Sequence, residues 1–219
     1  RGEFRERFEG FENSNFVEGG DDAYALSRFR FNVAVTANKH LAFQANLQDA
    51  RVAGKEVGPT TAPFRGPFDL RTAFADVGDA KAAIAVRLGR QELVYGESRL
   101  LGSLPWVNTG RSWDAAKVIL RSPLFQVDLF GASLVRSLPN EFDKSGNGNR
   151  FAAAYASSTK LLPKATVEPY VFWRRDVNIR SELGALGTLS QTTIGTRVAG
   201  QLPARLDYGV EMALQRGGL

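Results

Sequence analysis

Arginine residues at every second position could hold anions along one side of an extended chain. Residues 28–35 read RFRFNVAV. Successive side chains of a β-strand point to opposite faces, so Arg28 and Arg30 share one face and Phe29 and Phe31 occupy the other. A guanidinium group stays charged at ordinary pH and pairs with a carboxylate through two parallel hydrogen bonds. Such a row could bind or guide an acidic ligand.

The same alternation assigns charged residues of other strands to polar faces. The basic residues assigned in this way are Arg28, Arg30, Arg87, Arg174 and Arg197. The carboxylates that share these faces include Glu168, Asp207 and Glu211. These acids could hold the arginines in place and moderate their field. The alternative is that they form only the solvated ion-pair networks found in any wet barrel interior.

Eleven segments with strand periodicity must position these side chains. They lie at residues 2–12, 23–36, 41–51, 69–78, 82–94, 112–121, 124–135, 149–158, 164–175, 190–200 and 205–215. The connections between them alternate in length. The short turns are TANKH, GDAK, RSP, STKLLP and GQLPA, and the longer loops lie near 13–22, 52–68, 95–111, 136–148 and 176–189. Tight turns on one side and longer loops on the other are typical of an antiparallel up-and-down transmembrane β-barrel.

The cost of placing charge in lipid decides which face would be inside such a barrel. An arginine that faces lipid at mid-bilayer costs about 2–4 kcal/mol, so Arg28 and Arg30 together would cost about 4–8 kcal/mol. We therefore expect the arginines to face the lumen and the apolar residues to face lipid. Tyr24, Trp173 and Tyr208 lie toward strand ends and are expected in the interfacial aromatic girdles. Gly89, between Arg87 and Arg90, is expected to form a bulge.

Composition excludes several other classes of protein. The 219 residues contain no cysteine, and no run of 18 apolar residues could form a transmembrane helix. The net charge is +5, but the basic residues are spread along strands, so nucleic-acid binding is not expected. The single histidine, His40, lies in a short turn, and no metal, cofactor or catalytic residue is predicted. An odd strand number and abrupt ends predict one barrel domain, residues 1–219, truncated at both ends.

The densest group of polar and aromatic residues lies in GRQELVYGESRLLGSLPWVNTGRSWD, residues 89–114. This segment resembles the alginate-export family of outer-membrane porins, whose members carry a similar run. So do LRTAFADVGD at 70–79 and RGEFRERFEGFEN at 1–13. The matching arginines are Arg90, Arg99 and Arg111. We expect the loop within this segment to pack into the lumen and to narrow it; a plain surface loop is the alternative.

The resemblance implies a monomeric barrel of eighteen strands, of which this chain would supply eleven. It also implies passive passage of an anionic uronate polysaccharide through an arginine-rich channel in the outer membrane of a Gram-negative bacterium. The expected partners are an anionic saccharide or small anionic solute, membrane lipid and a periplasmic export machinery. Two alternatives stay open: a general diffusion porin with a mild anion preference, and a soluble β-sandwich or ligand-binding barrel. An enzyme built on a barrel, with Glu168, Asp207 or Glu211 as acids, is the least favoured reading.

Overall fold

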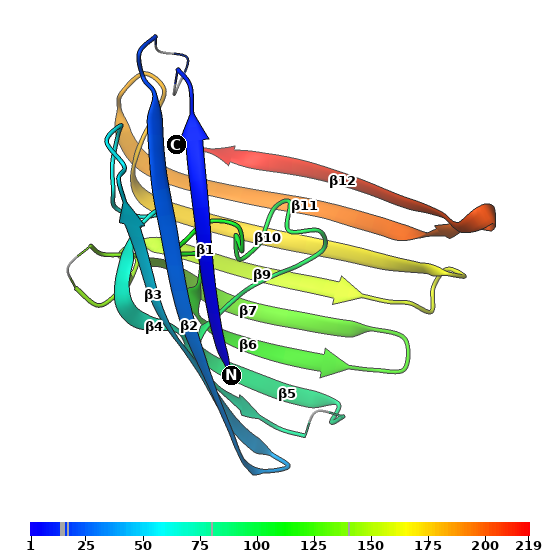
Figure 1. The fold of residues 1–219 in the computed structure, drawn as a ribbon. Helices are drawn as coiled ribbons and strands as arrows, with labels where there is room; N and C mark the ends of the chain where they lie inside the picture. The colour runs from blue at the N-terminus through cyan, green and yellow to red at the C-terminus, as the bar shows by residue number, and fades with distance from the viewer. Residues whose placement is uncertain (14–15, 17, 80, 140) are drawn as a thin grey trace.

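The computed structural model describes residues 1–13, 16, 18–79, 81–139 and 141–219, and nearly all of its regular structure is β-strand. The strands form one antiparallel sheet that follows chain order (Figure 1). The strands are β1 (Gly2–Phe11), β2 (Asp22–Asn38), β3 (Leu41–Ala53), β4 (Gly66–Val77), β5 (Ile84–Gln91), β6 (Trp113–Arg121), β7 (Gln126–Arg136), β8 (Lys144–Ser145), β9 (Asn149–Ser157), β10 (Ala165–Arg180), β11 (Leu186–Leu202) and β12 (Leu206–Gly218). A 3-10 turn, η2 (Pro203–Arg205), joins the last two. Within the described ranges, no helix is long and apolar enough to cross a membrane.

The eleven expected strands are confirmed, and the alternation of connection lengths holds for most of the chain. The two-residue strand β8, which pairs with β7, was not expected in the 136–148 loop. The prediction of a long loop at 176–189 is wrong, because β10 continues to Arg180 and β11 already begins at Leu186. A register shift between Asp176 and Ile179 lets the two strands continue pairing as far as this tight hairpin. Residues 14, 15, 17, 80 and 140 of the expected connections lie outside the described residues.

The sheet curves so that β1, β2 and β3 stand across from β9 to β12, and β4 bends strongly between the two parts (Figure 1). Neighbouring strands pair in chain order, except that β7 pairs with β9 on the main path. β1 and β12 are the two ends of this order. The architecture is therefore the all-β, antiparallel, up-and-down sheet that the sequence predicts.

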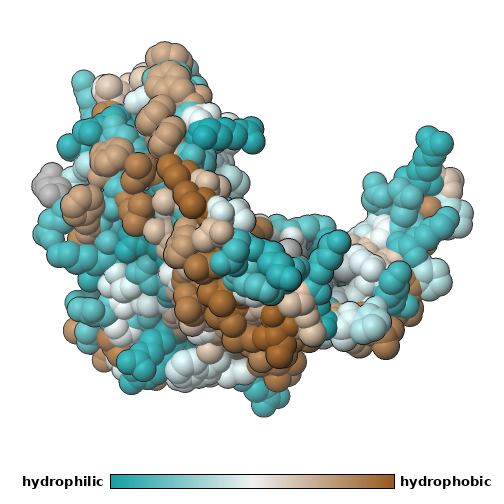
Figure 2. Space-filling model, turned by 90° about the horizontal axis from the view of Figure 1, so that it is seen from below, coloured by the Kyte–Doolittle hydropathy of each residue, from teal (hydrophilic) through white to brown (hydrophobic). Residues whose placement is uncertain are grey.

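The two faces of the sheet differ in chemistry. We call the face that carries Arg28 the inner face and the face that carries Phe29 the outer face. Arg28 is 5% exposed and Arg30 is 8% exposed, whereas Phe29 and Phe31 are 46% and 44% exposed. Hydrophobic side chains gather in patches on the surface seen in Figure 2, which is also hollowed between the two parts of the sheet. On β2 the apolar side chains thus lie on the exposed outer face and the arginines are buried on the inner face, which is the separation of faces that alternation predicts.

An aromatic cluster occupies the inner face of β6 to β10. Tyr155 and Tyr170 stack with ring centroids 5.8 Å apart, and Phe172 stacks on Tyr170 at 4.6 Å. Phe151 reaches both Phe172 and Trp113. These rings make part of the inner face apolar, next to its charged residues. Tyr24 also lies on the inner face, where its hydroxyl donates to Glu9 at 2.6 Å, so its predicted place in an outer aromatic girdle is wrong.

The connection between β5 and β6, residues 92–112, lies across the inner face, and we call it the inner loop. It is the green segment inside the curve of the sheet in Figure 1. Leu93 and Leu101 of this loop are buried against Trp113 and Phe130. Its far end reaches β2 and β3, because the Asn108 amide donates to the carbonyl oxygens of Ser27 and Arg51, each at 3.0 Å. The loop therefore packs against the interior, as expected from the sequence.

Candidate functional site

A group of five arginines on the inner face forms the basic cluster: Arg5, Arg7, Arg28, Arg30 and Arg71. The register explains the first four. Arg5 lies opposite Arg28, and Arg7 lies opposite Leu26, so all project from one face of β1 and β2. Arg71 joins from β4, where register shifts against β3 after Asn46 and after Gln48 interrupt the simple alternation. Five guanidinium groups thus lie on the inner face of β1, β2 and β4.

Carboxylates neutralise only part of the basic cluster. Arg28 pairs with Glu3 at 2.6 Å, and Arg7 Nε lies 2.6 Å from Glu9. Arg71 pairs with Glu92 of the inner loop. Five arginines against these three carboxylates leave an excess of two positive charges. Buried charge of one sign is costly unless it is compensated, so an anion would be stabilised here.

Backbone carbonyl oxygens of the inner loop hold several of these guanidinium groups. Arg5 and Arg28 both donate to Pro105 O, at 3.2 and 3.1 Å, and Arg28 also reaches Val107 O at 3.3 Å. Arg7 donates to Trp106 O at 2.6 Å and lies over the Trp106 ring at 4.4 Å. Carbonyl dipoles stabilise the cations without cancelling their net charge. The loop and the cluster therefore fix each other in place.

Several buried donors of the basic cluster have no acceptor among the described residues. They are Arg5 Nε, Arg28 Nε, Arg30 Nη2 and Arg71 Nε. Arg30 Nη2 and Arg71 Nη2 both approach Gly110, whose φ is +75°. A Cβ atom at that position would lie 3.0 Å from Arg71 Nη2 and 3.4 Å from Arg30 Nη2. Glycine thus lets the two guanidinium groups converge, and Arg30 Nη2 and Arg71 Nε are buried without an acceptor among the described residues.

The other strand arginines predicted from alternation also lie on the inner face, but they carry ion-pair partners. Arg87 makes a two-pronged contact with Asp76 at 2.6 and 2.9 Å. Arg174 pairs with Asp176 on its own strand. Arg197 pairs with both Glu168 and Glu97. Their positive charge is largely balanced, in contrast to that of the basic cluster.

The three arginines taken from the family motif do not gather at one point. Arg90 pairs in register with Asp114 and contacts it at 2.9 Å, on the face opposite to Arg87. No register shift occurs at Gly89, so the expected bulge is wrong; Gly89 instead adopts a φ of +120°. Arg99 is exposed and contacts Glu97 at 3.3 Å. Arg111 is held through its backbone N–H, which donates to Ser103 O at 2.8 Å.

The predicted carboxylates lie on the inner face of β10 and β12. Glu168 accepts from Arg197, Glu211 accepts from the Tyr170 hydroxyl at 2.8 Å, and Asp207 accepts from Gln201 at 3.1 Å. Each therefore orients a neighbouring side chain. The inner loop adds Glu97, and its hydrogen bond with Arg197 lowers the pKa of the Glu97 carboxyl from its ordinary value of 4.5.

An open polar groove of about 420 Å³ runs beside the basic cluster on the inner face. Arg71, Arg87 and Lys117 contribute cations to its lining, and Glu92 and Asp128 contribute carboxylates. Lys117 lies 3.5 Å from Asp128, which also accepts from the Tyr95 hydroxyl at 2.8 Å. The groove has the mixed charge and the size needed to hold part of a hydrated polar molecule.

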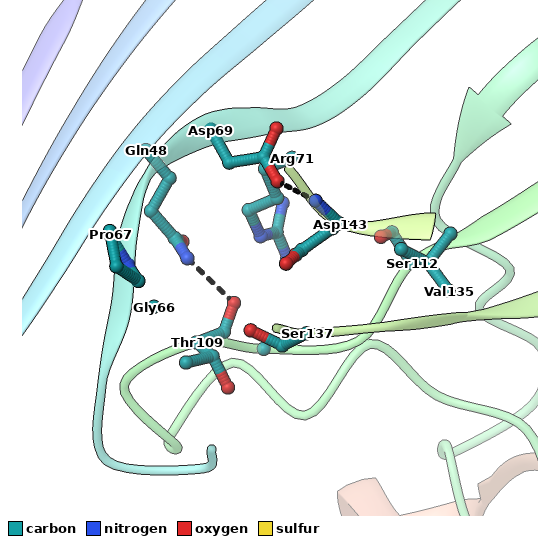
Figure 3. A pocket seen from close by; sticks show the side chains of 11 residues that line it. Gln48, Gly66, Pro67, Asp69, Arg71, Thr109, Ser112, Val135, Ser137 and Asp143 are labelled. Atoms are coloured by element: carbon teal, nitrogen blue, oxygen red, sulfur yellow. Dashed lines mark hydrogen bonds between the residues drawn. The ribbon is translucent and has the colours of Figure 1, made fainter. Parts of the chain in front are cut away.

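A small cavity of about 30 Å³ lies under the bend of β4 (Figure 3). The Asp143 N–H donates to Asp69 there, and the Gln48 amide donates to Thr109 O at 2.8 Å. Burial, with the nearby Asp69 carboxylate as a further cause, raises the pKa of Asp143. The cavity has room for about one water molecule. It serves to join the inner loop to the 137–148 connection, and it is too small for a sugar.

Sequence reasoning missed several basic residues of the inner face, among them Arg5, Arg7, Arg71 and Lys117. The signal for Arg5 and Arg7 was present, since they alternate with the outward residues Phe4 and Phe8. Lys117 and Asp114 of the same strand lie on opposite faces, and the register places Lys117 opposite Arg87 and Phe130. The irregular pairing of β3 with β4 concealed Arg71.

A family model described as "Alginate export" matches residues 1–219, the whole chain. No curated protein matches the chain.

Proposed function

The chain belongs to the alginate export family, and on that basis we propose that it forms an outer-membrane channel for an anionic saccharide of the uronate type. The membership implies transport of a polysaccharide through an outer-membrane barrel. The finer assignment, to passive passage of a polyanion along an arginine-rich lumen, is our proposal. The observation that carries it is the excess positive charge of the basic cluster, on the face opposite to the apolar side chains.

The basic cluster has the chemistry that a chain of carboxylates requires. Its arginines project from β1, β2 and β4, and the polar groove continues past them to Arg87 and Lys117. A polyanion can move from one cationic site to the next if each site is favourable enough to enter and weak enough to leave. The partial compensation by Glu3, Glu9 and Glu92 keeps each site from binding too tightly.

The inner loop would set the width of the passage. It occupies the inner face, and Arg5, Arg7 and Arg28 hold it through its carbonyl oxygens. A saccharide that passes this level must then run beside guanidinium groups whose positions are fixed. Ordered cations lose less entropy on binding than flexible ones, which favours a planar carboxylate over a diffuse anion.

Block of ionic current by uronate oligomers tests this proposal. The protein is inserted in a planar bilayer in potassium chloride, and oligomers are added to one side. We expect concentration-dependent block by uronate oligomers and little block by neutral glucose oligomers of equal length. Equal block by both, or by neither, would contradict a uronate channel.

A general diffusion porin with a mild anion preference is the second candidate. It is favoured by the ion pairs that occupy Arg87, Arg174 and Arg197, which weaken the field over much of the inner face. The same bilayer experiment separates the two, since a general porin would conduct chloride well without oligomer block. Under either candidate, we propose a monomer in the outer membrane of a Gram-negative cell; for the uronate channel we also propose a periplasmic export machinery as its partner.

A further inference from the structure

Two arginines lie side by side on the outer face without a carboxylate partner. Arg150 of β9 pairs directly with Arg175 of β10. Their sequence neighbours Phe151 and Arg174 are on the inner face, so both guanidinium groups project outward. Like charges placed directly opposite each other destabilise a sheet. Neither side chain forms an ion pair or hydrogen bond with any residue that the structure describes, so the pair lacks an anion.

An apolar depression begins immediately beside this pair on the outer face. Gly131 lies opposite Ala116 and Ala152, and Ala152 lies opposite Trp173. These small side chains form the floor of a groove of about 510 Å³, and Leu129, Val171 and Trp173 stand along it. The three larger side chains are 39%, 42% and 37% exposed. The groove has no charged residue in its lining.

Along β9 and β10, Arg150 and Arg175 lie nearer the long loops, and the apolar groove lies farther from these loops. Arg150 is the second residue of β9, directly after the 137–148 connection, and Ala152 and Ala154 follow on the same face. In outer-membrane barrels the longer loops lie outside the cell. This inference rests on the proposed function, because it needs the outer face to meet an outer membrane. The arginines would then lie at the headgroup level of the outer leaflet, with the groove among the acyl chains.

We propose that Arg150, Arg175 and the apolar groove bind one phosphate-bearing lipid of the outer leaflet. The two guanidinium groups bind the phosphate, for which their paired N–H donors are suited. An acyl chain lies over Gly131, Ala116 and Ala152. Trp173, between charge and groove, suits the level where headgroup meets chain. Arg216, outward-facing on β12 and two strands away, adds positive charge on the same side.

Binding of three matched ligands to the detergent-purified protein tests the site, with native mass spectrometry as the readout. The ligands are dioleoyl phosphatidic acid, dioleoylglycerol and inorganic phosphate. We expect phosphatidic acid to bind at least about tenfold more tightly than either of the others, since each lacks one half of the contact. Equal binding of dioleoylglycerol would overturn the role of the arginines. Equal binding of inorganic phosphate would overturn the choice of a lipid.

Two variants localise the effect. R150Q/R175Q removes the charge from one exposed and one half-buried position, and we expect it to lower the affinity for phosphatidic acid about tenfold. G131L fills the groove, where no atom lies within 4 Å of the position of a Cβ, and should weaken binding similarly. The control R28Q/R30Q changes the inner face and should bind the lipid as the wild type does. Unchanged affinity in R150Q/R175Q would overturn the proposal, whatever R28Q/R30Q does to ion selectivity.

Discussion

Arg5 and Arg28, from two neighbouring strands, converge on one carbonyl oxygen, that of Pro105, at 3.2 and 3.1 Å. This contact joins the first two strands of the sheet to a residue of the inner loop about 80 to 100 positions later in the chain. It also places two guanidinium groups close together on the inner face. The width of the passage and its charge therefore depend on the same few side chains.

Asn108 should anchor the far end of the inner loop. Its amide donates to the carbonyl oxygens of Ser27, Arg51 and Phe64, and the side chain is 1% exposed. In N108A these acceptors lose their donor, which should cost about 1–3 kcal/mol of loop anchoring. We expect larger current fluctuations in single-channel recordings. N147A, which removes an exposed amide from the 137–148 connection, is the control; equal noise in the two variants would rule out this anchoring role.

The middle of the inner loop should loosen in acid. The hydrogen bond from Arg197 lowers the pKa of Glu97 in the folded protein below its ordinary value of 4.5. The contact between Glu97 and Arg197 therefore stabilises the loop fully above pH 4.5, and this stabilisation is lost as the pH falls through the folded-state pKa of Glu97. Wild-type recordings should become noisier below pH 4.5, and E97Q should be noisy at all pH values. If E97Q kept the same pH-dependent step as the wild type, another group would control it.

Gly89 should resist substitution. Its φ of +120° is rarely adopted by residues with a side chain, and a Cβ atom would lie 2.3 Å from Ala73 O in the neighbouring strand. We expect G89A to lose about 2–4 kcal/mol of stability in urea unfolding from lipid vesicles. G131A is the matched control, since a Cβ there meets no atom within 4 Å. Equal stability of the two variants would show that β5 relaxes at no cost.

A new positive charge should cost more stability on the outer face than on the inner face. Val33 is on the outer face and 41% exposed, whereas Gln44 lines the polar groove of the inner face. V33R should cost about 2–4 kcal/mol in lipid vesicles if Val33 faces the bilayer centre. Q44R at a neighbouring level should cost less than about 1 kcal/mol, because its side chain meets water. A larger loss in Q44R would reverse the assignment of the faces.

Strict alternation made most of the fold predictable from the sequence. In β2 every second side chain is polar over residues 28–32, so one register alone keeps the arginines out of lipid. Alternation also answers for β10, where Val171, Phe172 and Trp173 follow one another. The parity that places Glu168 and Arg174 inward also places Phe172 inward, where it packs in the aromatic cluster. The register shift between Asp176 and Ile179, after which pairing with β11 resumes, could not be read from β10 alone.

The candidate site was harder to predict than the fold. Arg28 and Arg30 followed from local periodicity, but Arg71 reaches the same cluster through irregular pairing of β3 and β4. The motif grouped Arg90 with Arg99 and Arg111, although uninterrupted pairing turns Arg90 toward Asp114. Contacts between residues far apart in the chain, such as Arg28 with Pro105, decide which charges remain uncompensated. No local pattern carries that information.

The reversal potential of the channel in a potassium chloride gradient tests the central claim most directly. The wild-type protein should prefer chloride, because the basic cluster carries two more positive charges than its three carboxylates balance. R28A/R30A removes two of these charges and should shift the reversal potential toward that of a non-selective pore, while R150A/R175A on the outer face should leave it unchanged. An unaltered reversal potential in R28A/R30A, with the channel folded and open, would contradict an arginine-lined path for anions.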